Sequence, residues 1–145
     1  MAILNSEEQE SVAHAISLAE NMTSGEIRVV VENSLGSSDS AIQKAAQYFE
    51  KLDMHKTVLR NGVLIYLAVV DHAFAIIGDE GINNRVSEDF WENTKNQMLE
   101  HFRNGDYANG LIAGIKDAGE QLSQYFPRKD DDINELPNDI YFGKN

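Results

Sequence analysis

The most chemically suggestive side chains of this chain lie between residues 79 and 84. Asp79, Glu80, Asn83 and Asn84 carry the carboxylate and amide oxygens that Ca²⁺ and Mg²⁺ take as ligands in proteins. Their spacing departs from the EF-hand pattern, so that type of calcium loop is excluded. Two interpretations remain open: a hard-cation or phosphate-handling site, and a glycine-shaped turn with solvated acids, which is the simpler of the two.

Two basic side chains and one amide could assist such a site by binding phosphate. Arg28 lies within a strand-like segment, while Arg60 and Asn61 directly precede another. A guanidinium can hold a phosphate or a carboxylate through two parallel hydrogen bonds. The sequence therefore predicts phosphate contacts from Arg28, Arg60 and Asn61, and it assigns no catalytic residue.

Three strand-like segments must position these side chains. Residues 26–33 and 63–70 are rich in β-branched and apolar residues, and residues 73–77 follow the short turn at Asp71 and His72. A helix between the first two strands predicts a right-handed crossover with the strands parallel. The two-residue turn forces the third strand to run back.

These strand directions place three polar loops at the same edge of the sheet. Residues 23–25 and 60–62 precede the two parallel strands, and residues 79–84 follow the strand that returns. Convergent loops on a rigid sheet are where a binding site is expected. The candidate residues therefore meet at one place, although they are distant in the sequence.

Helices should flank this sheet. The first begins at a capping box of Ser6 and Gln9 and ends near Asn21. The second is capped by Ser38 or Asp39, and helical spacing predicts that its inward face consists of Ile42, Ala45, Ala46, Phe49 and Leu52.

Two further helices follow the third strand, one starting at residues 87–89 and one extending from Asp106 to Phe126. Trp91, Thr94, Met98 and Phe102 should face inward from the first of these. The predicted fold class is α/β, with a small mixed central sheet, a βαβ unit plus an antiparallel hairpin strand, sandwiched between helices on both faces. Charged residues on one face of strand 26–33 predict a partial cover that leaves their charges in water.

The chain should form one domain and a tail. Residues 1–126 hold every predicted strand and helix, and residues 127–145 begin with a charged run that is typical of a solvated linker. The tail then carries more apolar residues than a disordered segment would, namely Ile133, Leu136, Ile140, Tyr141 and Phe142. We expect it to dock on the domain or on a partner.

Composition narrows the function further. The net charge of −12 disfavours contact with nucleic acid or anionic membrane surfaces. The absence of cysteine excludes disulfides and thiolate chemistry. The longest apolar run is too short for a membrane span and the start lacks a signal peptide, so we expect a soluble cytoplasmic protein without membrane insertion. Four scattered histidines and the lack of nucleotide or nucleophile motifs leave no other catalytic signal.

Four segments in order resemble the TPM domain family. They are residues 23–31 (TSGEIRVVV), 61–65 (NGVLI), 76–82 (IIGDEGI) and 102–107 (FRNGDY). The resemblance covers about residues 6–126 and implies helices on both sides of a small central sheet. It also implies a heterogeneous function: one plant member has reported acid phosphatase activity and calcium binding, an animal member is a receptor accessory, and bacterial members are often envelope proteins.

Two departures from the family pattern bear on function. Members often have an acidic residue where this chain has Arg60, which weakens an inherited metal or phosphatase site. Many members also carry a signal peptide and a membrane anchor, which are not apparent in this sequence. The leading hypothesis is a soluble TPM-type binding or accessory module with a protein partner, for which an envelope or membrane protein system is one candidate. The alternative is a divalent-cation-dependent acid phosphatase-like hydrolase that uses Ca²⁺ or Mg²⁺.

Overall fold

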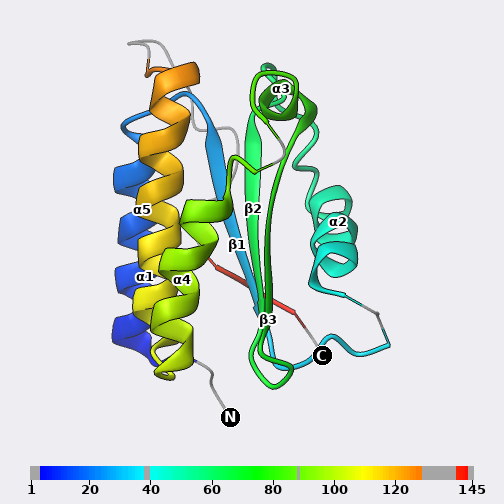
Figure 1. The fold of residues 1–145 in the computed structure, drawn as a ribbon, viewed down its shortest axis with the longest axis vertical. Helices are drawn as coiled ribbons and strands as arrows, with labels where there is room; N and C mark the ends of the chain where they lie inside the picture. Colours follow the sequence, from blue (N-terminus) through cyan, green and yellow to red (C-terminus); the bar gives the residue numbers. More distant parts are fainter. Residues whose placement is uncertain (1–3, 38–39, 88, 129–139, 144–145) are drawn as a thin grey trace.

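A four-stranded mixed sheet lies between two unequal layers of helices in the computed structural model (Figure 1). The structure describes residues 4–37, 40–87, 89–128 and 140–143. In chain order the elements are α1 (Ser6–Glu20), β1 (Glu26–Glu32), α2 (Ala41–Lys51), β2 (Gly62–Ala68), β3 (Ala73–Gly78), α3 (Glu80–Asn83), α4 (Glu92–Arg103), α5 (Tyr107–Tyr125) and β4 (Tyr141–Phe142).

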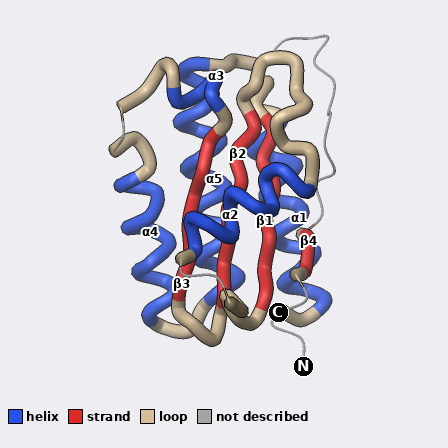
Figure 2. The backbone as a smooth tube through the Cα atoms, turned by 90° about the vertical axis from the view of Figure 1, so that its right-hand side faces the viewer, coloured by secondary structure: helices blue, strands red, loops and turns tan. Residues whose placement is uncertain are grey.

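The sheet has the strand order β3-β2-β1-β4 (Figure 2). β1 pairs with β2 in parallel over its whole length, and β2 pairs with β3 in the antiparallel direction. Helices α1, α4 and α5 cover one face, and α2 covers the other (Figure 1). The predicted fold class, a small mixed sheet between helices on both faces, is confirmed.

Two hydrophobic clusters fill the spaces on the two faces. The larger cluster joins α1, α4 and α5 to alternate residues of β1 and β2, among them Ile27, Val29 and Ile65. The smaller one lies under α2 around Val30 and Tyr66. Because both faces are covered, every residue of β1 and β2 is buried. The prediction that charges on one face of β1 reach water is therefore wrong.

The inward face of α2 agrees with the prediction only in part. Ala45 is buried, and Phe49 and Leu52 pack against the smaller cluster, as predicted. Ile42 and Ala46 are exposed instead, and Lys44 and Tyr48 are buried in the helix. Lys44 and Tyr48 both contact the buried carboxylate of Glu32 on β1, which gives these two polar residues partners inside the fold. The N-cap is Ser40, and the predicted caps Ser38 and Asp39 lie outside the described residues.

Two helix starts and one loop were also predicted incorrectly. The capping box of α1 consists of Asn5 and Glu8, not Ser6 and Gln9, because the helix begins at Ser6 itself. α4 begins only at Glu92, since Ser87 hydrogen-bonds to the carboxylate of Asp89 in a turn instead of capping a helix. Residues 80–83, expected as a loop, form the short helix α3.

The last two long helices agree better with the sequence. Trp91, Thr94, Met98 and Phe102 are buried as predicted. Asp106 caps α5 by accepting a hydrogen bond from the backbone nitrogen of Asn109 at 3.2 Å. None of the helices in the described part of the chain is long and apolar enough to cross a membrane.

Part of the C-terminal segment lies against the sheet. Tyr141 and Phe142 form β4, which pairs in parallel with Val30 and Val31 of β1. Residues 129–139, which include Ile133 and Leu136, lie outside the described residues. The boundary between a domain of residues 1–126 and a tail of residues 127–145 stays a prediction.

Candidate functional site

Three loops meet at the end of the sheet where α3 lies, as the strand directions predicted (Figure 1). We call residues 23–25, 60–62 and 79–84 the α3 edge. Backbone hydrogen bonds tie its parts together: the nitrogen of Asp79 donates to the oxygen of Gly62 at 2.9 Å, and that of Gly81 donates to the oxygen of Arg60 at 2.9 Å. The nitrogen of Glu26 donates to the oxygen of Asn61 at 3.4 Å.

The centre of the α3 edge is an arginine held by two carboxylates. Arg60 Nε and Nη2 donate to Asp79 Oδ2 and Oδ1 at 2.8 and 3.0 Å, which is a two-pronged pairing. Arg60 Nη1 lies 3.1 Å from Glu80 Oε1. The hydrogen bonds to Asp79 raise the pKa of Arg60, and the charges of Asp79 and Glu80 act in the same direction. The guanidinium therefore occupies the space between the two carboxylates.

The local backbone brings Arg60 and α3 together. Arg60 has a φ of 52°, in the left-handed region that non-glycine residues seldom adopt. Asp79 is the N-cap of α3, and its Oδ1 accepts a hydrogen bond from the nitrogen of Glu80 at 2.7 Å. A Cβ atom on Gly81 would overlap the carbonyl oxygens of Leu59 and Arg60. Glycine at this position is what allows α3 to pack against the Arg60 backbone.

The loop of residues 23–25 is attached to the end of α5. The Thr23 hydroxyl donates to the carbonyl oxygen of Phe126, and the backbone nitrogen of Ser24 donates to the same oxygen at 2.9 Å. The nitrogen of Gly25 donates to Thr23 Oγ1 at 3.1 Å. Asn61 is buried, with its Nδ2 3.4 Å from Ser24 Oγ. The side chain of Asn61 therefore connects two of the three loops.

The remaining predicted site residues are less closely associated. Asn83 Nδ2 donates to the carbonyl oxygen of Gly78 at 3.0 Å, and Asn84 is exposed at the end of α3. Arg28 is buried on the α2 face of β1, and its Nε has no hydrogen-bond partner among the described residues. The structure thus brings Arg60, Asn61, Asp79 and Glu80 together and places Arg28 within the strand.

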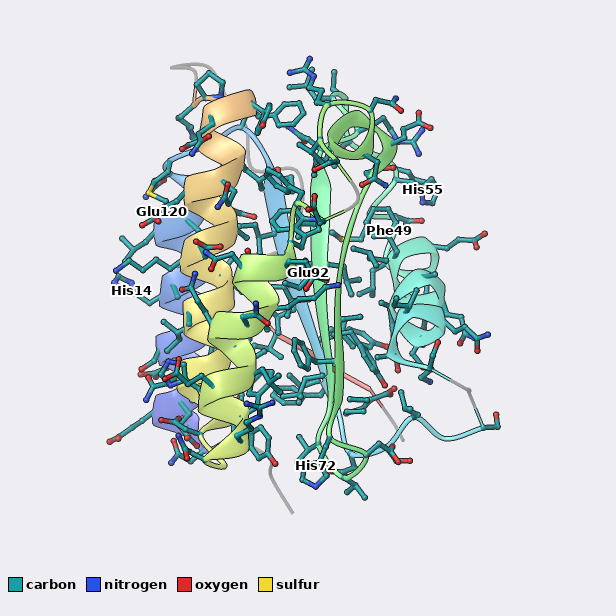
Figure 3. All side chains as sticks on the ribbon, in the orientation of Figure 1. His14, Phe49, His55, His72, Glu92 and Glu120 are labelled. Carbon is teal, nitrogen blue, oxygen red and sulfur yellow. The ribbon has the colours of Figure 1, made fainter. Side chains whose placement is uncertain are left out.

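The donor set of the α3 edge is a poor fit to a divalent cation while Arg60 is paired. Both oxygens of Asp79 accept hydrogen bonds, and a cation would have to displace the guanidinium. No group of three or more acidic or histidine side chains in the described part of the chain is arranged to hold a metal ion. The metal role of Asp79, Glu80, Asn83 and Asn84 stays a prediction. Figure 3 shows His14, His55 and His72 on separate parts of the molecule.

A pair of buried carboxylates was not predicted from the sequence. Glu20 at the end of α1 and Glu26 at the start of β1 are 5% and 3% exposed. Glu20 Oε2 accepts a hydrogen bond from the nitrogen of Ile27 at 2.8 Å, and Arg128 Nη1 donates to the Glu20 carbonyl oxygen at 3.0 Å. Burial raises the pKa of Glu20 to about 8, and the neighbouring charge of Glu26 adds to the rise. No motif links these residues, because the contact depends on how α1 packs beside β1.

A second buried polar cluster lies toward the opposite end of β1. Glu32 accepts hydrogen bonds from Tyr48 Oη at 2.6 Å and from Tyr66 Oη, and Lys44 Nζ lies 3.3 Å from Glu32 Oε2. Burial raises the pKa of both tyrosines, and the hydrogen bonds to Glu32 raise it further. The sequence signal that could have revealed this cluster is a lysine and a tyrosine four residues apart on one helical face.

The chain is similar to proteins of a known domain family. Residues 1–121 match the family model described as the TPM domain. The chain belongs to the TPM domain family. The solution structure of the BA42 protein from the psychrophilic bacterium Bizionia argentinensis is 48% identical, covers 97% of this chain and 95% of that one, and superposes with a TM-score of 0.90.

Two more distant structures share the fold. The N-terminal domain of the cg2496 protein from Corynebacterium glutamicum is 16% identical, with a TM-score of 0.66 over 87% of this chain and 78% of that one. The N-terminal domain of a protein from P. gingivalis is 20% identical, with a TM-score of 0.66 over 86% and 80% of the two chains. No protein with a curated function matches the chain.

Proposed function

We propose that this TPM domain is a binding or accessory module that recognises a protein partner through the α3 edge. The observation that carries the proposal is the apolar pair directly before Arg60: Val58 is 85% exposed and Leu59 is 47% exposed. Protein interfaces typically combine an apolar centre with a polar and charged rim. Val58 and Leu59 supply the apolar part, and Arg60 with Glu80 supplies the charged part.

The charged part of this surface is held in place before any partner arrives. Arg60 is paired with the buried carboxylate of Asp79, so little side-chain freedom is left to lose on binding. The Glu80 side chain is 62% exposed and can accept a hydrogen bond from outside. Together with the net charge of −12, this favours a partner that presents apolar and basic side chains.

The test is capture of a partner from extracts of cells that produce the protein. The full chain should retain the partner, and Val58→Asp should lose it, because a charge replaces the centre of the apolar contact. Val70→Asp is the matched control, since Val70 is 67% exposed in the turn after β2, away from the α3 edge. The captured protein, once purified, should bind the unmodified chain and the Val70→Asp variant at least about tenfold more tightly than it binds Val58→Asp. An affinity loss of about tenfold is what the removal of one good interface contact costs.

The proposal fails if both variants retain every captured protein as well as the unmodified chain does. It also fails if purified partners bind Val58→Asp with unchanged affinity.

The second candidate is a divalent-cation-dependent, acid phosphatase-like hydrolase that uses Asp79, Glu80, Asn83 and Asn84. One observation favours it: a cavity of about 330 Å³ adjoins α3 and is lined by Asn83, Val86, Ser87 and Trp91. Titration with Ca²⁺ and Mg²⁺ while following the amide signals of residues 78–84 tests the cation. Phosphomonoester turnover that depends on the cation and disappears in Asp79→Ala, with the fold intact, would favour the hydrolase over the binding module.

A further inference from the structure

Among the residues that the structure describes, the outer edge of β1 is only partly paired. On one side β1 pairs with β2 along its full length, and on the other the described residues pair with it, through β4, at Val30 and Val31. Near its start, the nitrogen of Ile27 donates to the Glu20 carboxylate instead of to a strand. Unpaired strand edges are templates for the addition of another strand. The half of this edge next to Glu32 is where the chain's own β4 adds, so it is the place where an extended peptide can add in its stead.

Residues 140–143 of the chain show how such a peptide sits. Ile140 is buried in the cluster on the α1 side, and Tyr141 lies on the α2 side, with its ring centroid 5.6 Å from that of Tyr48. Lys51 Nζ lies 5.6 Å from the centroid of the Tyr141 ring. The nitrogen of Gly143 donates to the carbonyl oxygen of Val31 at 2.9 Å. Alternate side chains thus enter alternate faces, as in strand-addition complexes.

Gly143 meets the buried carboxylate cluster directly. A Cβ atom at this position would overlap Glu32 Oε1 and Tyr48 Oη, and it would lie 2.8 Å from Glu32 Cδ. Moving these atoms aside would cost stability, because Glu32 accepts hydrogen bonds from Tyr48 and Tyr66 and forms an ion pair with Lys44. This position therefore accepts glycine because a larger residue would collide with Glu32 and Tyr48. The Glu32 cluster thus selects for glycine directly after the paired strand.

We propose that this edge of β1 is a peptide-binding site that adds an extended segment of the pattern apolar–aromatic–any–glycine, and that residues 140–143 are its internal occupant. An external segment of a partner protein with this pattern replaces them. The family match ends at residue 121, so residues 140–143 lie beyond the matched range. The site goes beyond the proposed function, because it lies toward the end of the sheet opposite the α3 edge.

Within the described residues, the strand pairing of the internal occupant is short, so exchange with an external segment is feasible. β4 has two residues, and each backbone hydrogen bond contributes only about 1 kcal/mol net. Residues 129–139 connect the occupant to Arg128. Because the occupant belongs to the same chain, an external peptide must compete with a segment that is always present.

The experiment uses the full chain with Gly143→Ala, which should displace the internal segment and leave the core in place. A synthetic peptide with the sequence of residues 138–145 is titrated while the amide signals of Val30, Val31 and Glu32 are followed. The peptide should bind the Gly143→Ala chain at least about tenfold more tightly than the unmodified chain, whose own segment competes. A peptide with alanine in place of the glycine should bind the same variant at least about tenfold more weakly.

Phe142→Ala is the matched control within the same segment. Phe142 is 41% exposed, and its neighbour Gly143 would still fit against Glu32, so this variant should bind the external peptide as weakly as the unmodified chain does. Saturable shifts that distinguish the two peptides support the proposal. Equal binding of both peptides, no binding by Gly143→Ala at millimolar peptide, or an unmodified chain that is a dimer through exchanged segments would each overturn it.

Discussion

Replacing Glu20 by glutamine should change how the stability of the protein depends on pH. Glu20 is 5% exposed, and its carboxylate lies beside that of Glu26 and near Arg128. Burial and the charge of Glu26 raise the pKa of Glu20 from 4.5 to about 8. Glutamine has nearly the same shape and can still accept the hydrogen bond from the nitrogen of Ile27, but it has no charge to bury.

The direction and size of the effect follow from this pKa. Between pH 4.5 and about 8 the folded state binds a proton at Glu20 that the unfolded state has released. The free energy of unfolding therefore falls as pH rises through this window, and it stays at its lower value above pH 8. Each pKa unit corresponds to about 1.4 kcal/mol, so the loss is on the order of a few kcal/mol.

Glu20→Gln should not show this pH-dependent loss of unfolding free energy. At pH 9 the variant should be more stable than the unmodified protein by a few kcal/mol, on the order set by the pKa shift, and near pH 4 the two should be about equal. Urea unfolding followed by the fluorescence of Trp91, the single tryptophan and a buried one, measures both stabilities. Glu10→Gln, an exposed substitution on the same helix, should give no pH-dependent difference. Two results would refute the reasoning. One is a difference in the free energy of unfolding between Glu20→Gln and the unmodified protein that is the same at pH 4 and pH 9. The other is a variant that is less stable than the unmodified protein at pH 9.

Two further substitutions test how the α3 edge is built. Gly81→Ala should lower the free energy of unfolding by roughly 1–3 kcal/mol, because the new methyl group collides with the backbone oxygens of Leu59 and Arg60. These backbone atoms cannot rotate away as a side chain could. Urea unfolding measures the change, and an unchanged unfolding midpoint would contradict the prediction. Thr23→Val should cost about 1–3 kcal/mol by removing the hydroxyl that joins Phe126 and Gly25. Thr23→Ser, which keeps that hydroxyl, should cost clearly less in the same assay, and equal losses would argue against the hydrogen bonds as the cause.

Much of the architecture could be predicted from residue patterns and connection lengths. The helix between β1 and β2 and the short turn before β3 determine the directions of the three strands. Once those directions are known, residues 23–25, 60–62 and 79–84 must share an edge. The inward face of α4 also follows from its residue periodicity, because Met98, Phe102 and Thr94 recur at helical spacing and are buried.

The contacts of the polar residues could not be predicted in this way. Periodicity marks the apolar face of a helix, but a charged residue looks the same in the sequence whether it is solvated or buried with a partner. Lys44 and Tyr48 face the sheet and contact the buried carboxylate of Glu32, which the apolar stripe of α2 does not indicate.

The sequence by itself thus determined which loops meet at one edge of the sheet. Only the tertiary structure decided which side chains of these segments pair or come into close contact. The packing of α3 places Arg60 between Asp79 and Glu80, a pairing that the sequence alone did not predict. Glu20 meets Glu26, and Gly143 meets Glu32, only because distant segments pack side by side. Strand direction depends on local connections, whereas charge pairing depends on distances of a few ångströms between elements far apart in the sequence.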